Sequence, residues 1–253
     1  MSLPALRRVG LLVLIVAASA VATATAALVE VDDVVLRADG GFRPQTLPRK
    51  QFVPIEFEGK VDIAAKPGRA FPRLQQALID FDRDGRLSVA GLPTCDPGTI
   101  DEASPEEARS ICRGSLVGEG EIQVIVIAGG KSARTSSPLT IFNGPRLGEL
   151  PTAVLHARFT IPNTETYAIL VPIEKRRGDF RYRARLDLPP LAEGYGALTH
   201  VEVEIGRRYR AGGRKRSYVS ARCSDNVIET RGRFSFEDGT VIDGWVEKYC
   251  HSK

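Results

Sequence analysis

The stretch that decides the fold reads SYVSARC over residues 217–223, RGRFSF over 231–236 and VIDGWVEKY over 241–249. Each run is rich in β-branched and aromatic residues, and turn-forming residues separate the runs. This composition predicts three β-strands. Asp238-Gly239 stands between the second and third runs and predicts that they form a hairpin.

Two registers of this hairpin are open. A two-residue turn pairs Phe236 with Val241, whereas a three-residue loop with Gly239 in the left-handed region pairs Phe234 with Ile242. A slip of one residue turns the apolar side chains of one strand to the opposite face of the sheet. Only the three-residue loop keeps the apolar residues of both strands together, so we predict that loop, with a glycine bulge.

Four cysteines predict disulfide bonds in an oxidising compartment, and three connectivities are possible. We favour Cys95–Cys112 and Cys223–Cys250, because each pair closes a short segment that contains turn residues. Zinc binding is the alternative, but it would require Cys-x-x-Cys spacings that the sequence lacks. We therefore expect no metal and no cofactor.

Residues 1–26 predict a secretory signal peptide: Arg7 and Arg8 precede an apolar run, and an Ala-x-Ala motif ends at Ala26. An uncleaved membrane anchor is the alternative, since residues 9–28 could just span a bilayer. We expect cleavage, a secreted or otherwise extracytoplasmic protein, and no transmembrane segment afterwards. The remaining chain divides into a leader segment, 27–50, with at most one edge strand, and a single β domain, 51–253.

The domain continues with alternating apolar residues from Val53 to Ile63, which predict a long half-buried strand. Arg83-Asp84-Gly85 predicts a second hairpin, with Phe81 opposite Leu87. Ser104-Pro105-Glu106-Glu107 predicts the start of a short helix, because it supplies an N-cap, a proline at the first position and acids at the positive end of the helix dipole.

Further strands recur at the spacing of a β-sandwich or barrel. They are predicted at residues 121–128, 139–142, 154–159, 167–173, 180–188 and 198–205. We predict an all-β, antiparallel β-sandwich of about ten to twelve strands with one short helix, since a second sheet readily covers an apolar sheet face. A curved sheet or barrel wrapped around the helix, enclosing an apolar cavity, is the alternative.

Several blocks of sequence occur in an order that resembles a family of secreted bacterial β-rich proteins without an assigned function. These blocks are GLPTC (91–95), LVGEG (116–120), FNG (142–144), PP (189–190) with GYG (194–196), SYVSARC (217–223) and FSFEDGT (234–240). The resemblance covers residues 74–250. It implies export, a shared β scaffold and the same two cysteine pairs, and it implies no activity.

The candidate binding residues are mainly cationic. Six of them surround Ala211-Gly212-Gly213 at the tip of a predicted hairpin: Arg207, Arg208, Arg210, Arg214, Lys215 and Arg216. Such a tip could bind phosphates or anionic cell-envelope polymers. The alternative is a solvated loop that keeps the protein soluble and blunts strand edges. A second cationic face is predicted on one strand at Arg181, Arg183 and Arg185.

Two aromatic residues are further candidates. Tyr195 stands between Gly194 and Gly196 and could stack on a ligand, although we favour packing over the end of the sheet. Trp245 faces away from Ile242 on the predicted register. We interpret it as a core residue of a second layer, with a surface binding role as the alternative.

No catalytic motif stands out. The three histidines, His156, His200 and His251, show no metal-ligand spacing and no neighbouring nucleophile motif. Asp80, Asp82 and Asp84 match the first positions of a calcium loop, but Gly91 occupies the position of its bidentate glutamate. The hairpin explains these residues without a metal.

We therefore expect a non-enzymatic, cell-envelope-associated binding module that acts through its cationic hairpin, with anionic envelope polymers or another surface protein as its partner. A carrier of a lipid or other apolar ligand is the first alternative, and a hydrolase on a β-sandwich scaffold is the second. A formal charge of +4, lowered by two on removal of Arg7 and Arg8, does not suggest a nucleic-acid partner.

Overall fold

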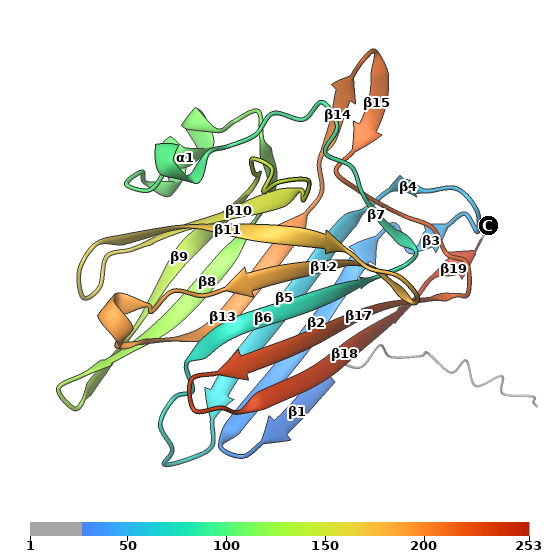
Figure 1. The fold of residues 1–253 in the computed structure, drawn as a ribbon. Coiled ribbons are helices and arrows are strands. Elements are labelled where there is room, and N and C mark those ends of the chain that lie inside the picture. Colours follow the sequence, from blue (N-terminus) through green and yellow to red (C-terminus); the bar gives the residue numbers. More distant parts are fainter. Residues whose placement is uncertain (1–26, 253) are drawn as a thin grey trace, which may run out of the picture.

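A single antiparallel sheet of twelve strands dominates the computed structural model, which describes residues 27–252 (Figure 1). In spatial order the strands are β1 (Ala27–Val31), β2 (Val34–Arg43), β5 (Glu56–Ala65), β13 (Gly196–Ile205), β8 (Leu116–Ala128), β9 (Lys131–Asn143), β10 (Thr152–Phe159), β11 (Glu165–Lys175), β12 (Phe180–Asp187), β6 (Leu74–Asp82), β17 (Val227–Phe236) and β18 (Val241–Tyr249).

The sheet curls into a nearly closed barrel. Strands β12, β6 and β17 cross the near wall in Figure 1, and β8 and β13 cross the far wall. The two edges meet where β18 packs against β1 and β2. No backbone hydrogen bonds join the two edge strands, β1 and β18, among the described residues. Side chains close the gap instead: Lys248 Nζ of β18 lies 2.7 Å from Asp39 Oδ1 of β2.

The all-β class and the single short helix are confirmed, but the sandwich is wrong. A sandwich and a barrel both require strands with one apolar face, so alternation within a strand does not distinguish them. Here the curvature of one sheet brings its apolar face against itself. The predicted alternative was also partly wrong, because the helix lies outside the barrel (Figure 1).

The barrel interior is filled by side chains from every wall. Leu36 of β2 and Ile242 of β18 are fully buried, and Phe234 and Phe236 of β17 are nearly so. The period-two alternation of each strand points these side chains to the same, inner face of the sheet. At about 25 cal/mol for each Å² of apolar surface removed from water, such residues supply most of the driving force for folding.

The C-terminal hairpin has the predicted register. Phe234 pairs with Ile242, the Phe236 N–H donates to the Thr240 carbonyl at 2.9 Å, and Gly239 has a φ of 88°. The three-residue loop is therefore confirmed. Trp245 does face away from the core, but it is 59% exposed, so its interpretation as a core residue was wrong. A single sheet has no second layer to cover it.

The predicted hairpin at Arg83-Asp84-Gly85 is wrong. β6 is hydrogen-bonded along both edges, to β12 and to β17, and so has no free edge for the chain that follows it. β7 (Gly85–Leu87) instead leaves the barrel and pairs with β16 (Val219–Ala221). With β4 (Val53–Pro54) these strands form a small sheet of order β4-β16-β7 at one end of the barrel.

The leader segment contains more structure than the sequence predicts. Residues 27–50 form β1, β2 and β3 (Thr46–Leu47), and β3 pairs in parallel with β19 (His251–Ser252). The predicted signal peptide and its cleavage site lie outside the described residues. Within residues 27–252, no helix is long and apolar enough to cross a membrane.

The predicted helix is confirmed as α1 (Pro105–Ile111). Ser104 accepts a hydrogen bond from the Glu107 N–H, and Glu107 accepts one from the Ser104 N–H, which together form a capping box. The Cys95–Cys112 disulfide fastens this segment, including the short 3-10 helix η1 (Pro97–Thr99), over the outer face of β9 and β10. The Cys223–Cys250 disulfide is also formed, so both predicted pairings are confirmed.

Candidate functional site: a cationic hairpin

The cationic run forms a two-stranded hairpin of β14 (Arg208–Ala211) and β15 (Arg214–Ser217), which stands off the barrel (Figure 1). It is inserted between β13 and β16. Gly212 and Gly213 form its tip with φ values of 57° and 74°, a conformation that favours glycine. The two glycines therefore form a tight turn, and most of the side chains on the two strands beside it are cationic.

One face of the hairpin is fixed to the protein body. The Tyr209 hydroxyl donates to the Ser88 carbonyl at 3.0 Å. Ala211 lies so close to Gly91 that a Cβ added there would stand 2.5 Å from the Ala211 Cβ. At the base, Arg207 Nη1 donates to the Leu116 carbonyl at 3.0 Å. These contacts hold the hairpin in one orientation.

The other face carries only cations at its exposed positions. Alternation along β14 puts Arg208 and Arg210 on the same side, and the register puts Lys215 directly opposite Arg210. All three side chains are exposed, and none is within 4.0 Å of a carboxylate of residues 27–252. Like charges placed directly opposite one another destabilise a strand pair. No carboxylate of the described residues offsets the repulsion between Arg210 and Lys215.

The other predicted cations of the hairpin point elsewhere. Arg214 is exposed but shares a face with Tyr209. Arg216 is half-buried, and its Nε has no hydrogen-bond partner within residues 27–252. Arg207 is used at the base. The six predicted binding residues thus divide into an outward trio of Arg208, Arg210 and Lys215, named here the free cationic face, and three residues directed to the tip or the body.

Tyr195 does not join this site. It follows the short helix η2 (Ala192–Gly194), immediately before β13, whereas the hairpin follows the other end of β13. Ten residues of strand separate the two by about 30 Å. Tyr195 is 54% exposed, so the predicted packing over the end of the sheet does not cover it.

The second predicted cationic face, on β12, is occupied by intramolecular partners. Arg183 donates from Nε and Nη2 to the two carboxylate oxygens of Asp80, at 2.8 and 2.7 Å. Asp80 is buried, and the hydrogen bond from Arg183 raises the pKa of the guanidinium. Arg185 Nε donates to Asp187 at 2.9 Å. Arg183 and Arg185 therefore serve the fold, whereas Arg181 donates from Nε to the Arg83 carbonyl at 2.9 Å and has no carboxylate partner among residues 27–252.

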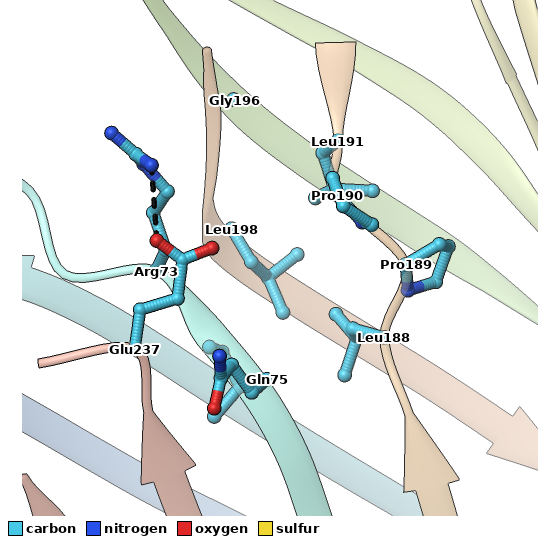
Figure 2. Close-up of a pocket in the computed structure, with 10 residues that line it drawn as sticks. Arg73, Gln75, Leu188, Pro189, Pro190, Leu191, Gly196, Leu198 and Glu237 are labelled. Carbon is cyan, nitrogen blue, oxygen red and sulfur yellow. Dashed lines mark hydrogen bonds and ion pairs between the residues drawn. The ribbon is translucent and has the colours of Figure 1, made fainter. Parts of the chain in front are cut away.

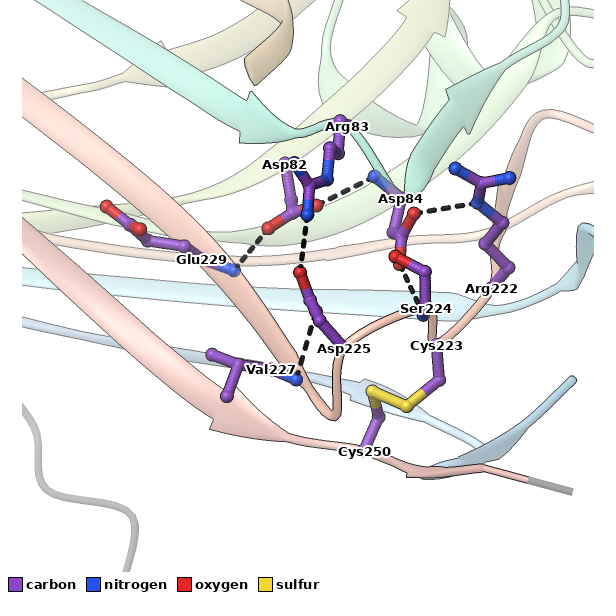
Figure 3. Close-up of a disulfide and its surroundings, with 10 residues drawn as sticks. All are labelled: Asp82, Arg83, Asp84, Arg222, Cys223, Ser224, Asp225, Val227, Glu229 and Cys250. Atoms are coloured by element: carbon purple, nitrogen blue, oxygen red, sulfur yellow. Dashed lines mark hydrogen bonds and ion pairs between the residues drawn. A yellow bond between two sulfur atoms is a disulfide. The ribbon is translucent and has the colours of Figure 1, made fainter. Parts of the chain in front are cut away.

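The aspartates of the calcium alternative do not converge on one point. Asp80 binds Arg183, Asp82 accepts from the N–H groups of Asp84 and Glu229, and Asp84 accepts from Arg222 Nε at 2.7 Å and the Ser224 N–H (Figure 3). Burial alone would raise the pKa of Asp84, but the hydrogen bonds from Ser224 and Arg222 outweigh it and hold that pKa below its ordinary value.

Two histidines occupy contrasting environments. His156 is fully buried beneath the α1 segment, where burial lowers its pKa, and its Nδ1 lies 3.5 Å from Thr140 Oγ1. His200 Nδ1 lies 2.7 Å from Asp62 Oδ1 on the outer wall. In the part of the chain that the structure describes, no three His, Cys, Asp or Glu residues are grouped to hold a metal.

One cavity has a volume of about 220 Å³ and lies where β6 and β13 begin, at the opposite end of β13 from the hairpin. Figure 2 shows the residues that line it. Leu188, Pro190 and Leu198 line one side of it. The ion pair of Arg73 and Glu237, at 3.0 Å, lies across from them. Neither histidine lines this cavity.

Comparison with protein-family models, curated proteins and solved structures finds no match for the chain. The resemblance to secreted bacterial proteins therefore identifies no family. What the structure confirms of that resemblance is the β-rich scaffold and the two disulfides.

Proposed function

We propose that the protein is a non-enzymatic extracytoplasmic binding module that engages anionic cell-envelope polymers through the free cationic face of its hairpin. The observation that carries the proposal is the contrast between this face and β12. Arg183 and Arg185 have carboxylate partners, whereas Arg208, Arg210 and Lys215 have none among the described residues.

The geometry of the hairpin suits a repeating anion. Residues two apart along a strand are about 7 Å apart, and directly opposed residues are about 5 Å apart. Arg208, Arg210 and Lys215 therefore present a short ladder of positive charge. Phosphate, sulfate or carboxylate groups along a polymer could each meet one rung, and arginine offers bidentate contacts to them.

The two disulfides indicate an oxidising compartment, which supports an extracytoplasmic site of action. Export through the N-terminal segment and retention at the envelope are parts of the proposal. Another surface protein with an acidic patch is the alternative partner, and the test below separates it from a polymer.

The alternatives receive less support. The cavity of about 220 Å³ gives a carrier of an apolar ligand little support, since pockets for such ligands usually measure about 300–1,000 Å³. A hydrolase would need its acid and base at a cleft, whereas the His200–Asp62 pair lies on the outer wall and does not line the cavity.

The proposal is tested by the binding of purified protein to insoluble, protein-free anionic wall material at increasing salt. The variant Arg208→Gln/Arg210→Gln/Lys215→Gln should lose most of its retention, and its salt dependence should flatten. The matched control Lys131→Gln/Arg134→Gln/Arg177→Gln removes the same charge from exposed positions elsewhere and should bind like the parent protein.

Equal loss in both triple variants would mean that only net charge matters, and it would refute a hairpin site. Retention by neither the parent nor the variants, together with hairpin-dependent capture by a purified acidic surface protein, would replace the polymer with a protein partner.

A further inference from the structure

A second cationic cluster lies at the small sheet β4-β16-β7, built from residues far apart in sequence. Three guanidinium groups stand over the ring of Phe52: Arg181 and Arg222 each at 5.1 Å from its centroid, and Arg86 at 5.7 Å. Of its members the sequence pattern singles out only Arg181, and it does not predict the cluster, because the four residues come from four separate segments of the chain.

The small sheet explains why these residues meet. Ser220 of β16 pairs with Pro54 of β4 on one side and with Arg86 of β7 on the other. Phe52 and Arg222 are each two residues from this row, so strand alternation puts them on the same face as Arg86. Arg181 enters from the end of β12, where its Nε donates to the Arg83 carbonyl at 2.9 Å.

The terminal nitrogens of these arginines remain available. Arg222 uses Nε for Asp84 and Arg181 uses Nε for a backbone carbonyl, so four of the five N–H groups of each guanidinium are left for a ligand. Arg86 has no hydrogen-bonded side-chain partner and no ion pair within residues 27–252. Among residues 27–252, Asp84 is the one carboxylate paired with the three arginines, so positive charge is in excess there.

The cluster is also held in place. Asp84 is buried and fixes Arg222 from below, and the Arg222 N–H donates to the Asp84 carbonyl at 3.1 Å (Figure 3). An aromatic ring beneath a guanidinium restricts its orientation and stabilises the cation. Since a ring has two faces, at least two of the three guanidinium groups stand over the same one.

We propose that Phe52, Arg86, Arg181 and Arg222 form a binding site for a tetrahedral oxyanion, a phosphate or sulfate group. Such a group has enough oxygens to accept hydrogen bonds from three guanidiniums, whereas a carboxylate has two. The site does not depend on the hairpin. Its ligand is either a free inorganic anion or one charged group of a larger molecule.

The site is tested by adding sodium sulfate to ¹⁵N-labelled protein at constant ionic strength, with sodium chloride as the reference, and following the arginine Nε–Hε NMR signals. The signals of Arg86, Arg181 and Arg222 should shift together and saturate. Arg86→Gln should weaken sulfate binding about tenfold or more, since it removes a charged donor without touching the Asp84–Arg222 pair.

The matched control is Arg134→Gln, which removes an exposed strand arginine of β9 that belongs to neither proposed site and should leave sulfate affinity unchanged. The unfolding midpoint of each variant verifies that the fold persists. Shifts that fail to saturate, shifts of all arginine signals alike, or equal losses in both variants would overturn the proposed site.

A third arm identifies the source of the anion and separates this site from the proposed function. Dextran sulfate is added to the Arg208→Gln/Arg210→Gln/Lys215→Gln variant. Saturating shifts at Arg86 would support a site that accepts the group of a polymer, and shifts with inorganic sulfate alone would support a site for a free anion. Sulfate binding by a parent protein that shows no wall retention would leave this site standing and refute the hairpin proposal.

Discussion

Two arginine-rich regions of this protein have the same composition and opposite environments. On β12, Arg183 and Arg185 alternate with apolar residues, and each finds a carboxylate on its own or a neighbouring strand. On the hairpin, Arg208 and Arg210 alternate in the same way but face Lys215 and solvent. β12 has strands on both sides, so its side chains find partners. The hairpin is a separate two-stranded sheet, so no third strand supplies a counter-charge.

The comparison shows that an arginine pattern does not identify a binding surface. What matters is whether the neighbouring strands supply counter-charges. A buried pair such as Arg183–Asp80 has been withdrawn from solvent and must be kept intact, whereas an uncompensated exposed cation can be removed at little cost to the fold. Four experiments would break or sharpen this distinction.

The largest effect tests whether the hairpin depends on the nearby covalent link. Cys223→Ser/Cys250→Ser removes the disulfide that joins two residues 27 positions apart in the chain. It should lower the free energy of unfolding, measured by urea titration, by about 3.5 kcal/mol. Wall retention of the folded protein should not change, because the hairpin is anchored by Tyr209 and Ala211. Reduced retention in the folded variant would show that the two regions are coupled.

The second effect concerns the paired arginine itself. Arg183→Gln leaves Asp80, whose side chain is 8% exposed, without its bidentate partner and should cost about 3 kcal/mol of stability. Arg210→Gln should change stability by less than about 0.5 kcal/mol. Combining Arg183→Gln with Asp80→Asn should recover part of the loss. Equal costs for the two single variants would contradict the distinction between the regions.

The third effect is a pH dependence expected in the paired region and not in the hairpin. The pKa of Asp84 lies below its ordinary value of 3.8 in the folded protein. The ionised carboxylate therefore stabilises the fold fully above pH 3.8, and this stabilisation is lost as the pH falls through the lowered pKa of the folded state. Asp84→Asn should cost about 2 kcal/mol at neutral pH and flatten the acid end of the stability curve.

Retention on a sulfated polymer, whose groups stay charged in this range, should not follow this acid transition while the protein stays folded, since residues 207–217 contain no carboxylate. A retention curve that tracks Asp84 would mean that the small sheet positions the hairpin.

The smallest effect on stability is the most specific for function. Lys215→Glu would place a carboxylate opposite Arg210 and turn a repulsive pair into an attractive one, so stability should rise by about 0.5 kcal/mol. Wall retention should fall at the same time. A variant that is more stable and binds less would show that the same residues lower the stability of the protein and bind the wall. Unchanged retention would contradict a binding role for Lys215.

The sequence predicts best what is decided locally. The register at Gly239 depends on one turn and on the apolar residues beside it, and the helix at Ser104 depends on its cap. Both were predicted correctly, as were the disulfides. The exposed hairpin was also recognised, because its glycines and cations are consecutive in the chain.

Long-range partners were beyond such reasoning. Phe81 and Leu87 satisfy every local rule for a hairpin, but β17, some 150 residues later, occupies the edge of β6 that this hairpin would need. The partner of Arg183 stands 103 residues away, and the cluster around Phe52 unites four distant segments. Whether the sheet closes on itself depends on curvature summed over twelve strands, which no single strand reveals.

The seam of the barrel also sets an order of events. β1 and β2 belong to the first part of the described chain and β18 to the last, and the ion pair across the seam joins residues 209 positions apart. The wall cannot be completed until both sides have emerged from the ribosome. Until then the edges of β2 and β17 and the apolar interior stay open to other chains, a period in which a chaperone would be of most use.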